Sequence, residues 1–516
     1  MVPHVGRRDV LRAGSALLLA GCAPFRRCAE VSGGARPEPL WGVQSGDVTE
    51  SGAVVWARSD RPARMMVVWS DGGFDGDHEV EGPYVGPETD LVGKVQLVGL
   101  PVGRKIEYRV RFDRSPWMLG SFRTPSRDAV DVTFAWSGDV NGQGWGIDPA
   151  HGGMPVYTAI LHEAPELFLH CGDAIYADNP IPPSLPIAGG GTWNNLLHEP
   201  RKNHVAETLD DYRAAHRYPR RSPEVQAASA SIPIFGVWDD HDVRNNWFPS
   251  EILEDPKYEE KRIDVLAVPA RQAFHEYAPT LRTPGSPMYR TAHWGPLVDF
   301  FFLDGRAFRT PNEPVAGSAA PFPPAESAFF GKVQTAWLLA ELAASKAVWK
   351  VIVADMPLGI VCSDIGRLGK LANDAVANGS TANGGGPVER EVEVASLLSG
   401  LKAHGVKNVV WLTAETHYCA AHRYDPARAI FKDFDPFWEL VAGPLHATMF
   451  PRKEADATFG PEVTWANVDW ERMGGPGDPS TQTFGSVRID GKTHAFQVRW
   501  IDAAGRVLHR LTIDPV

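Results

Sequence analysis

Short apolar runs separated by turn residues fill the chain from residue 40 to about residue 125. Residues 53–57 and 65–69 are rich in valine, methionine and tryptophan, and Gly, Pro and Asp lie between the runs. Residues 94–98 and 106–112 instead alternate polar and apolar positions. A period of two buries one face of a strand, and short strands at this spacing are typical of antiparallel sandwiches. We therefore expect a small immunoglobulin-like β-sandwich here, and we identify no catalytic chemistry in it.

Beyond residue 125 the pattern changes, because apolar runs are now followed closely by acidic residues or histidine. Residues 132–136 precede Asp139, residues 167–171 precede Asp173, residues 232–238 precede Asp240, and residues 409–413 precede Glu415 and His417. Helical stretches lie between such runs, as at residues 332–345 and 391–404. Repeats of strand, polar loop and helix predict α/β layers, and sites in such folds lie beyond the carboxyl ends of the strands.

The four strand ends carry side chains that hold hard metal ions, which prefer carboxylate and imidazole ligands. A bridging carboxylate holds two ions ~3.5–4 Å apart, where a bridging hydroxide can attack phosphorus and both ions offset phosphoryl charge. Taken singly, Asp139 and Asp173 are equally typical of turns, and His417 of a core histidine. Residues 239–242, Asp-Asp-His-Asp, are harder to explain that way, since like charges after a buried strand repel one another without a cation. Together the clusters favour a metal site.

Length and charge limit the classes of function. A chain of 516 residues exceeds the ~250–300 residues at which single cores stop growing, and we divide it at residues 1–37, 38–126 and 127–516. The formal charge of −12 argues against a nucleic-acid-binding surface. An acidic protein that holds a phosphate needs local positive charge, and metal ions are a compact source. The five cysteines form no CxxC pair, which argues against a thiolate zinc site.

The first 37 residues have the pattern of an export segment. Arg7 and Arg8 precede a short apolar run that ends in Leu19-Ala20-Gly21-Cys22. The run is too short to span a bilayer, and the paired arginines resemble a twin-arginine signal. Cys22 stands where bacterial lipoproteins carry their lipid, although a small-residue cleavage site that happens to contain cysteine has the same pattern. We expect an exported protein, periplasmic or at the cell surface, with a lipid anchor at Cys22.

Several motifs resemble the alkaline phosphatase D (PhoD-like) family of binuclear metallophosphoesterases. Gly-Asp-x-x-Tyr at residues 172–176 resembles the purple acid phosphatase signature, in which the tyrosine binds a ferric ion. Further motifs similar to the PhoD-like family lie at residues 42–47, 238–246, 303–306, 349–357, 412–418 and 437–445. The resemblance implies a metallophosphoesterase-type α/β/β/α sandwich after the N-terminal β-sandwich.

The resemblance also implies roles for individual residues. Asp139, Asp173, Tyr176 and His417 would hold the first metal, Asp240 and Glu415 the second, with Asp173 bridging both and Asp355 as a further ligand. His241 would lie over the leaving group, and Arg306 would contact a phosphate oxygen. The implied metals are iron with calcium or another divalent ion. Two departures affect this set: some members have a cysteine ligand just after the first cluster, where Asp139-Val140-Asn141 contains none, and Glu415 replaces the usual aspartate.

We therefore expect an exported, monomeric, metal-dependent hydrolase of small-molecule phosphate esters. Two alternatives remain open on the sequence. One is a dedicated phosphodiesterase or phospholipase-type enzyme near a membrane. Ester preference depends on loops whose conformation the sequence does not predict. The other is a non-catalytic surface lipoprotein whose sandwich domain binds a partner.

Overall fold

The computed structural model describes residues 36–72, 77–187, 189–314, 326–365, 371–377 and 386–516. The predicted export signal, with Arg7, Arg8 and Cys22, lies outside these residues, so the lipid-anchor prediction stays a prediction. Residues 37–516 form one compact unit. The boundaries expected at residues 37/38 and 126/127 likewise stay predictions.

The first strands form two antiparallel sheets, as the alternating pattern predicted. One sheet has the order β1 (Pro39–Gly46), β2 (Gly52–Ser59), β5 (Val92–Val98). The other has the order β4 (His78–Val85), β3 (Ala63–Ser70), β6 (Lys105–Phe112), β7 (Met118–Arg123). Val55, Val67 and Val110 are fully buried and share one apolar cluster, so the two sheets pack face to face. The predicted N-terminal β-sandwich is confirmed.

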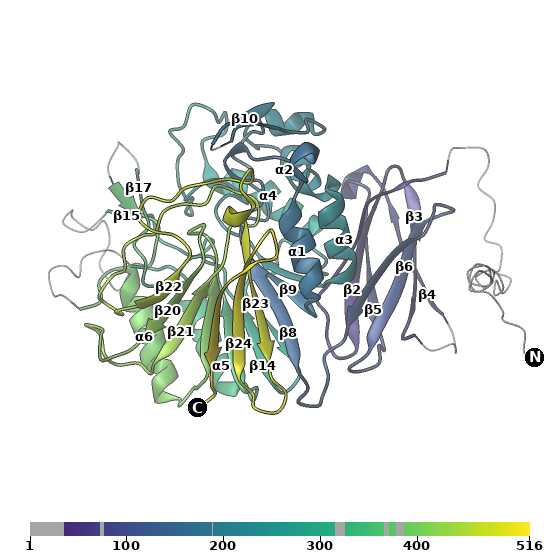
Figure 1. The fold of residues 1–516 in the computed structure, drawn as a ribbon. Helices are drawn as coiled ribbons and strands as arrows, with labels where there is room; N and C mark the ends of the chain where they lie inside the picture. The colour runs from purple at the N-terminus through teal and green to yellow at the C-terminus, as the bar shows by residue number, and fades with distance from the viewer. Residues whose placement is uncertain (1–35, 73–76, 188, 315–325, 366–370, 378–385) are drawn as a thin grey trace, which may run out of the picture. The chain divides into compact units, whose positions relative to one another are not determined.

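Two larger sheets form the second part of the fold (Figure 1). The six-stranded sheet has the order β12 (Ile234–Val237), β9 (Leu167–Cys171), β8 (Val132–Ser137), β23 (Thr483–Ile489), β24 (Phe496–Asp502), β25 (Val507–Ile513). The seven-stranded sheet has the order β13 (Arg290–Trp294), β14 (Val298–Phe302), β16 (Trp349–Val353), β19 (Val409–Thr413), β21 (Phe437–Val441), β20 (Ala420–Tyr424), β22 (Glu462–Ala466). Strands β8, β9 and β12 run parallel, and so do β14, β16, β19 and β21. Their carboxyl ends therefore lie at a common edge of each sheet.

Alternation along β14 shows how the layers are stacked. Phe300 and Phe302 belong to the apolar cluster between the two sheets, whereas Phe301 packs on the opposite face. That face is covered by α5 (Lys332–Ala344) and α6 (Arg390–Ala403), close to the helical stretches that the sequence predicted. The outer face of the six-stranded sheet is covered by α1 (Pro155–Glu163) and α3 (Pro223–Ser231). The α/β/β/α architecture is confirmed.

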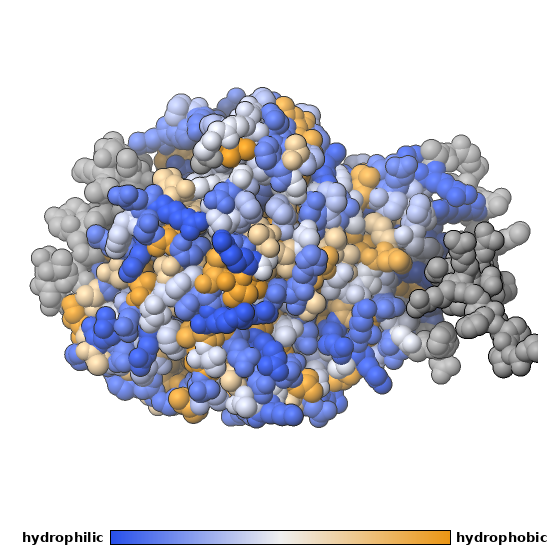
Figure 2. Space-filling model, in the orientation of Figure 1, coloured by the Kyte–Doolittle hydropathy of each residue, from blue (hydrophilic) through white to orange (hydrophobic). Residues whose placement is uncertain are grey.

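Smaller elements surround the carboxyl edge of the sheets. Helices α2 (Leu209–Arg217) and α4 (Ile263–Tyr277) pack on each other, and short strands occur at β10 (Ser184–Pro186), β11 (Thr192–Asn194), β15 (Glu313–Pro314), β17 (Ser363–Ile365) and β18 (Leu371–Asn373). Polar and apolar residues are interspersed on the face drawn in Figure 2. Within the described part of the chain, no helix combines the length and the hydropathy needed to cross a bilayer.

Phe300→Ala should destabilise the protein by about 3–5 kcal/mol, because it opens a cavity between the two large sheets. The Phe300 ring is fully buried and meets the Phe134 ring edge-on, with the centroids 5.1 Å apart. The measurement is the free energy of unfolding in urea. Val333→Ala is the control, since Val333 is 70% exposed on α5 and should cost less than about 0.5 kcal/mol. An equal, small loss for both variants would contradict the packing described.

Candidate metal centre

Acidic and histidine side chains gather where the parallel strands of both large sheets end. Asp139 follows β8, Asp173 follows β9, and Asp240 follows β12. From the other sheet, Glu415 and His417 follow β19. Each lies within a few residues of a buried strand, so the sheets fix their positions. The structure thus brings together the four strand-end clusters that the sequence singled out.

The backbone at these positions is unusual. Asp139, Asp173, Glu415 and His417 have φ angles of 68°, 52°, 46° and 60°, in the left-handed region that non-glycine residues rarely adopt. Residues held there cost of order 1–3 kcal/mol each, and such residues cluster at functional sites. Hydrogen bonds between neighbouring loops hold this conformation: the Val140 amide donates to the Asp173 carbonyl at 2.9 Å, and the His446 amide to the Asp139 carbonyl at 2.9 Å.

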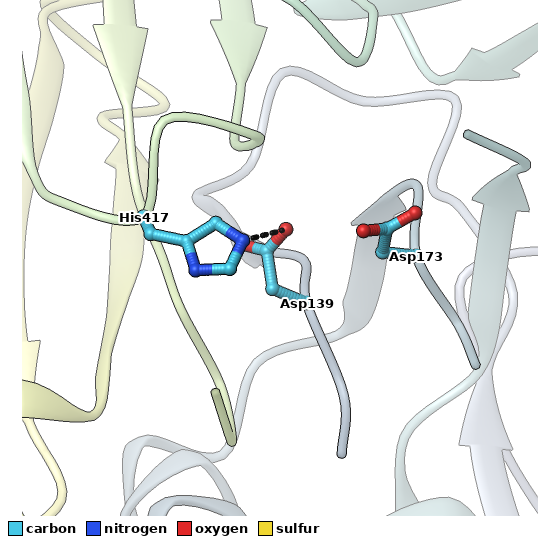
Figure 3. A group of neighbouring side chains, drawn as sticks. All are labelled: Asp139, Asp173 and His417. Carbon is cyan, nitrogen blue, oxygen red and sulfur yellow. Dashed lines mark ion pairs between the residues drawn. The ribbon is translucent and has the colours of Figure 1, made fainter. Parts of the chain in front are cut away.

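One group of donor atoms consists of Asp139, Asp173 and His417, whose ligand atoms all lie within 4.8 Å of one another. Figure 3 shows the His417 ring facing the Asp139 carboxylate, with Asp173 beside them. His417 Nε2 lies 3.4 Å from Asp139 Oδ1 and 2.7 Å from the Tyr176 hydroxyl. The other ring nitrogen, Nδ1, lies 2.5 Å from the Thr448 carbonyl, which accepts its proton and leaves Nε2 as the ligand atom.

A second group, within the same 4.8 Å limit, consists of Asp173, Asp239, Asp240 and Glu415, and a third of Asp173, Asp240 and His241. Asp173 belongs to all three groups, as a bridging ligand would. Asp239 was not predicted as a ligand, and its Oδ1 accepts a hydrogen bond from Arg306 Nε at 2.6 Å. Both carboxylate oxygens of Asp139 and one oxygen each of Asp173, Asp239 and Glu415 are buried without a hydrogen-bond partner.

The electrostatics of the cluster favour either protonated carboxyl groups or a bound cation. Burial raises the pKa of Asp139, Asp173 and Glu415 well above the usual range, and neighbouring carboxylates, Asp240 above all, raise it further. Burial also lowers the pKa of His417 to about 3, so its imidazole is neutral, the form that binds metals. The donor set and the orphaned oxygens fit two hard metal ions, which would restore the charged carboxylates.

His241 lies at the mouth of this cluster. Its Nδ1 is 2.7 Å from Asp178 Oδ1, and its ring stacks on Tyr176 with the centroids 4.0 Å apart. Burial would lower the pKa of His241, but Asp178 and Asp240 outweigh it and raise the pKa to about 9. The third donor group includes His241, so position alone also admits a ligand role. Sequence reasoning missed Asp178, although it lies two residues beyond the Gly-Asp-x-x-Tyr motif.

The structure places Arg306 deep in the protein, and its predicted contact with a phosphate oxygen stays a prediction. Arg306 is fully buried behind the carboxylates and pairs with Asp239 at 2.6 Å and with Asp374 at 2.9 Å. Burial lowers its pKa, but the surrounding carboxylates raise it well above the ordinary value, so the guanidinium acts as an internal counter-ion. Asp355 is buried beside it, 3.5 Å from Arg306 Nε, and is absent from the donor groups above.

A cleft of about 400 Å³ opens over the cluster. Its walls include the candidate site residues His241, Glu415 and His417. The other lining residues were not predicted as site residues: Gln143, Asp178, Asn179, Asn245, Asn246, Cys362, Asp374, Phe450 and Lys453. Cys171 and Cys419 are buried and line no part of this cleft. The cleft gives the donor groups access to a small molecule.

Comparison with known proteins places the chain in a family. Residues 134–500 match the sequence model of the PhoD-like phosphatases, and residues 27–126 match the model of the N-terminal domain of PhoD-like phosphatases. Alkaline phosphatase D of Bacillus subtilis (strain 168) is 26% identical over 337 residues, which cover 63% of this chain and 52% of the relative. The chain thus spans about half the length of this curated relative.

Two solved structures share the fold. A structure of PhoD matches with a TM-score of 0.63 and 19% identity, covering 92% of this chain and 88% of that chain. A purple acid phosphatase from yellow lupin (Lupinus luteus) seeds matches with a TM-score of 0.54 and 12% identity, covering 92% and 74%. At these identities the likeness concerns the fold alone. Because the family model covers well over half of the sequence, the chain belongs to the PhoD-like phosphatase family, whose members are phosphoric ester hydrolases.

Proposed function

We propose that this protein is an exported, metal-dependent hydrolase of phosphate esters, with an activity of the alkaline phosphatase D type. The observation that carries the proposal is Asp173, which takes part in all three donor groups at the carboxyl ends of the strands. When bound, two metal ions would activate water for attack on phosphorus and offset the charge of the phosphoryl oxygens.

The residues divide into two ligand sets. Asp139, Asp173, Tyr176 and His417 would hold the first ion, and Asp173, Asp240 and Glu415 would hold the second, with Asp239 near enough to contribute. A phenolate and an imidazole beside carboxylates suit iron in the first position, and a carboxylate set suits calcium or another divalent ion in the second. Asp355 is buried 3.5 Å from Arg306 Nε and outside the donor groups, and its role as a further ligand stays a prediction.

His241 supplies a proton to the leaving group. Asp178 binds Nδ1 at 2.7 Å, which leaves Nε2 as the free ring nitrogen of a side chain that lines the cleft. The Tyr176 ring stacked beneath the imidazole limits its rotation. Asp178 therefore positions the ring and favours its protonated form, as a general acid requires.

Ester preference separates the proposal from its closest alternative. Lys453 and the asparagines at the mouth of the cleft suit a small phosphate ester, whereas a phosphodiesterase or phospholipase-type enzyme would need room for two substituents. Turnover of matched mono- and diester substrates decides between them. The other alternative is a non-catalytic surface lipoprotein. Bound metal together with turnover of an aryl phosphate would exclude it, and the absence of both would support it.

Asp173→Asn should remove both metals and lower turnover on the order of 10³-fold. A bridging ligand contributes to two coordination spheres, so its loss removes several kcal/mol of charge stabilisation. Each ~1.4 kcal/mol lost from the transition state lowers the rate tenfold. The measurements are elemental analysis and hydrolysis of an aryl phosphate. Asp299→Asn is the matched control, since Asp299 is 5% exposed on β14 and pairs with His293 away from the cluster. Two bound metals in Asp173→Asn, with near-normal turnover, would rule out the bridging role.

His241→Ala should keep both metals and lose about 10²–10⁴-fold in turnover of alkyl phosphates. An alkoxide leaves poorly without a proton, whereas an acidic phenol leaves readily, so the loss on aryl phosphates should be smaller. Asp178→Asn should show the same substrate bias with a smaller loss, because the ring stays in place. Equal losses of turnover on both substrate types would mean that His241 stabilises charge and donates no proton. Loss of a metal would show that His241 is a metal ligand.

Metal-free protein should lose stability as the pH rises above about 4, the ordinary pKa of a carboxyl group, while metal-loaded protein should not. The pKa values of Asp139, Asp173, Asp239 and Glu415 are raised in the folded state, chiefly by burial. A carboxyl group whose pKa is raised by folding contributes stability that is full below the pKa of the unfolded chain and is lost as the pH climbs toward the pKa of the folded protein. The measurement is Tm against pH with and without a chelator. If Tm changes with pH in the same way with and without the chelator, the buried carboxyl groups do not have the raised pKa values described.

Export and anchoring complete the proposal. The arginine pair and Leu19-Ala20-Gly21-Cys22 support a mature protein tethered outside the inner membrane. Cys22→Ser should move the protein from the membrane to the soluble fraction, and Cys28→Ser should leave it tethered. The measurement is fractionation with mass spectrometry of the mature N-terminus. A wild-type protein that is soluble and starts downstream of Cys22 would exclude the anchor.

A further inference from the structure

A second cavity lies behind the metal centre, with a volume of about 110 Å³. Its walls come from β1, β9, β12, α2 and α4, so it touches both the N-terminal sandwich and the catalytic sheets. Val140 and Ala174, each next to a proposed metal ligand, form part of one wall, but no proposed ligand lines the cavity. The established family and the proposed function leave this cavity without a role.

Two histidines face the cavity without hydrogen-bond partners. His216 on α2 is 2% exposed and His275 on α4 is 4% exposed, and all four of their ring nitrogens lack a partner. The Nδ1 of His170 on β9 also lacks one. Buried polar atoms are satisfied in the large majority of cases, and each exception calls for a missing partner. Several orphaned nitrogens around one void point to a ligand that the protein itself does not supply.

Three arginines add positive charge to the same walls. Arg220, Arg282 and Arg290 line the cavity, and the Nε of each is buried without an acceptor. Asp47 supplies the one carboxylate among the described lining residues. Its Oδ1 lies 4.0 Å from Arg290 Nε, beyond hydrogen-bond distance, and its Oδ2 accepts from the Thr280 hydroxyl at 2.5 Å. Other N–H groups of the three arginines donate to backbone carbonyls, so their unpartnered donors are the Nε atoms, and Gln44 Oε1 is an unpartnered acceptor in the same lining.

The ionisation of these groups agrees with a missing anion. Burial lowers the pKa of Arg220 to about 10 and also lowers the pKa of Arg290. Arg306 is the counter-example, because carboxylates around it outweigh burial and raise its pKa. Burial and the charge of Arg220 lower the pKa of His216 well below 6.5, so the ring is neutral and offers one N–H. The cavity thus holds positive charge that no protein carboxylate balances fully.

Size and apolar walls narrow the class of anion. Phe168, Ile234, Phe274 and Met288 supply much of the remaining surface. An engineered apolar cavity of ~150 Å³ takes up benzene, so a void of about 110 Å³ suits a somewhat smaller molecule. A bare dianion would leave the apolar walls without a partner and would lose more hydration than a monoanion. A short carbon chain that carries one carboxylate suits both the apolar side chains and the arginine and histidine side chains of the cavity.

We propose that this cavity binds a small organic carboxylate of about two to four carbons, with its oxygens on the arginine and histidine donors and its chain against the phenylalanine walls. Arg282 and Arg290 are partly exposed, and they form a cationic rim through which such an anion would enter. The proposal does not depend on the metal centre or on phosphate ester hydrolysis.

The test is calorimetric titration of the metal-loaded, full-length protein with propionate. Propionamide, which has the same shape without the charge, is the control ligand. Arg282→Met and His216→Leu should each weaken propionate binding about tenfold or more, because each removes a buried donor. His293→Gln should leave the affinity unchanged, since the His293 side chain is 71% exposed elsewhere on the molecule. Arg282 is at the rim, so that variant keeps the test valid if His216→Leu fails to fold.

Several results would overturn the proposal. Equal affinity for propionate and propionamide would remove the role of charge, and an unchanged affinity in Arg282→Met would remove the role of the rim. Binding of sulfate without binding of propionate would replace the class of ligand by an inorganic oxyanion. The anomalous signal of 3-bromopropionate in crystals must lie in the cavity, because a signal at the metal centre alone, or no signal, would mean that the void holds only water.

Discussion

Repulsion among buried carboxylates is the constraint on which the rest of the structure depends. Asp139, Asp173, Asp240 and Glu415 come from four strand ends in two sheets, and water does not reach most of their oxygens. In an interior of low dielectric, such a cluster is unfavourable unless positive charge is placed within it. The protein places the buried guanidinium groups of Arg306 and Arg309 on the inner side. The groups of acidic and histidine side chains are positioned for a metal site.

The sheets make this concentration of charge possible. Parallel strands end at the same edge, and each site residue lies only a few residues beyond a strand that is buried on both faces. Aromatic packing between the sheets, as at Phe134 and Phe300, fixes the distance between the two edges. The site residues therefore sit on loops that this core anchors. A fold with the same loops on a looser core would not hold the oxygens together.

The sequence predicted the fold and the inner site well, because both have local signals. An acid after a buried apolar run is visible in the chain, and Asp139, Asp173 and Asp240 each follow one. The ion pairs of Arg306 could not be predicted, because its partner Asp374 is 68 residues away along the chain and only the fold brings it to 2.9 Å. Phe450 and Lys453 were missed for the same reason, since they reach the cleft from a loop with no strand-end pattern. The choice of metals, the anchor and the ester preference depend on features that neither local pattern nor fold determines.

The left-handed backbone at Asp139, Asp173, Glu415 and His417 has a consequence for how this chain can change over generations. Glycine adopts that conformation without steric penalty, so a glycine there would relax the main chain while deleting a ligand. Such replacements would also relieve like-charge repulsion in a chain that carries no metal. Inactive descendants of this fold would then be no less stable than the active one, and selection for stability alone would erode the site. Only continued demand for the chemistry keeps these four residues in place.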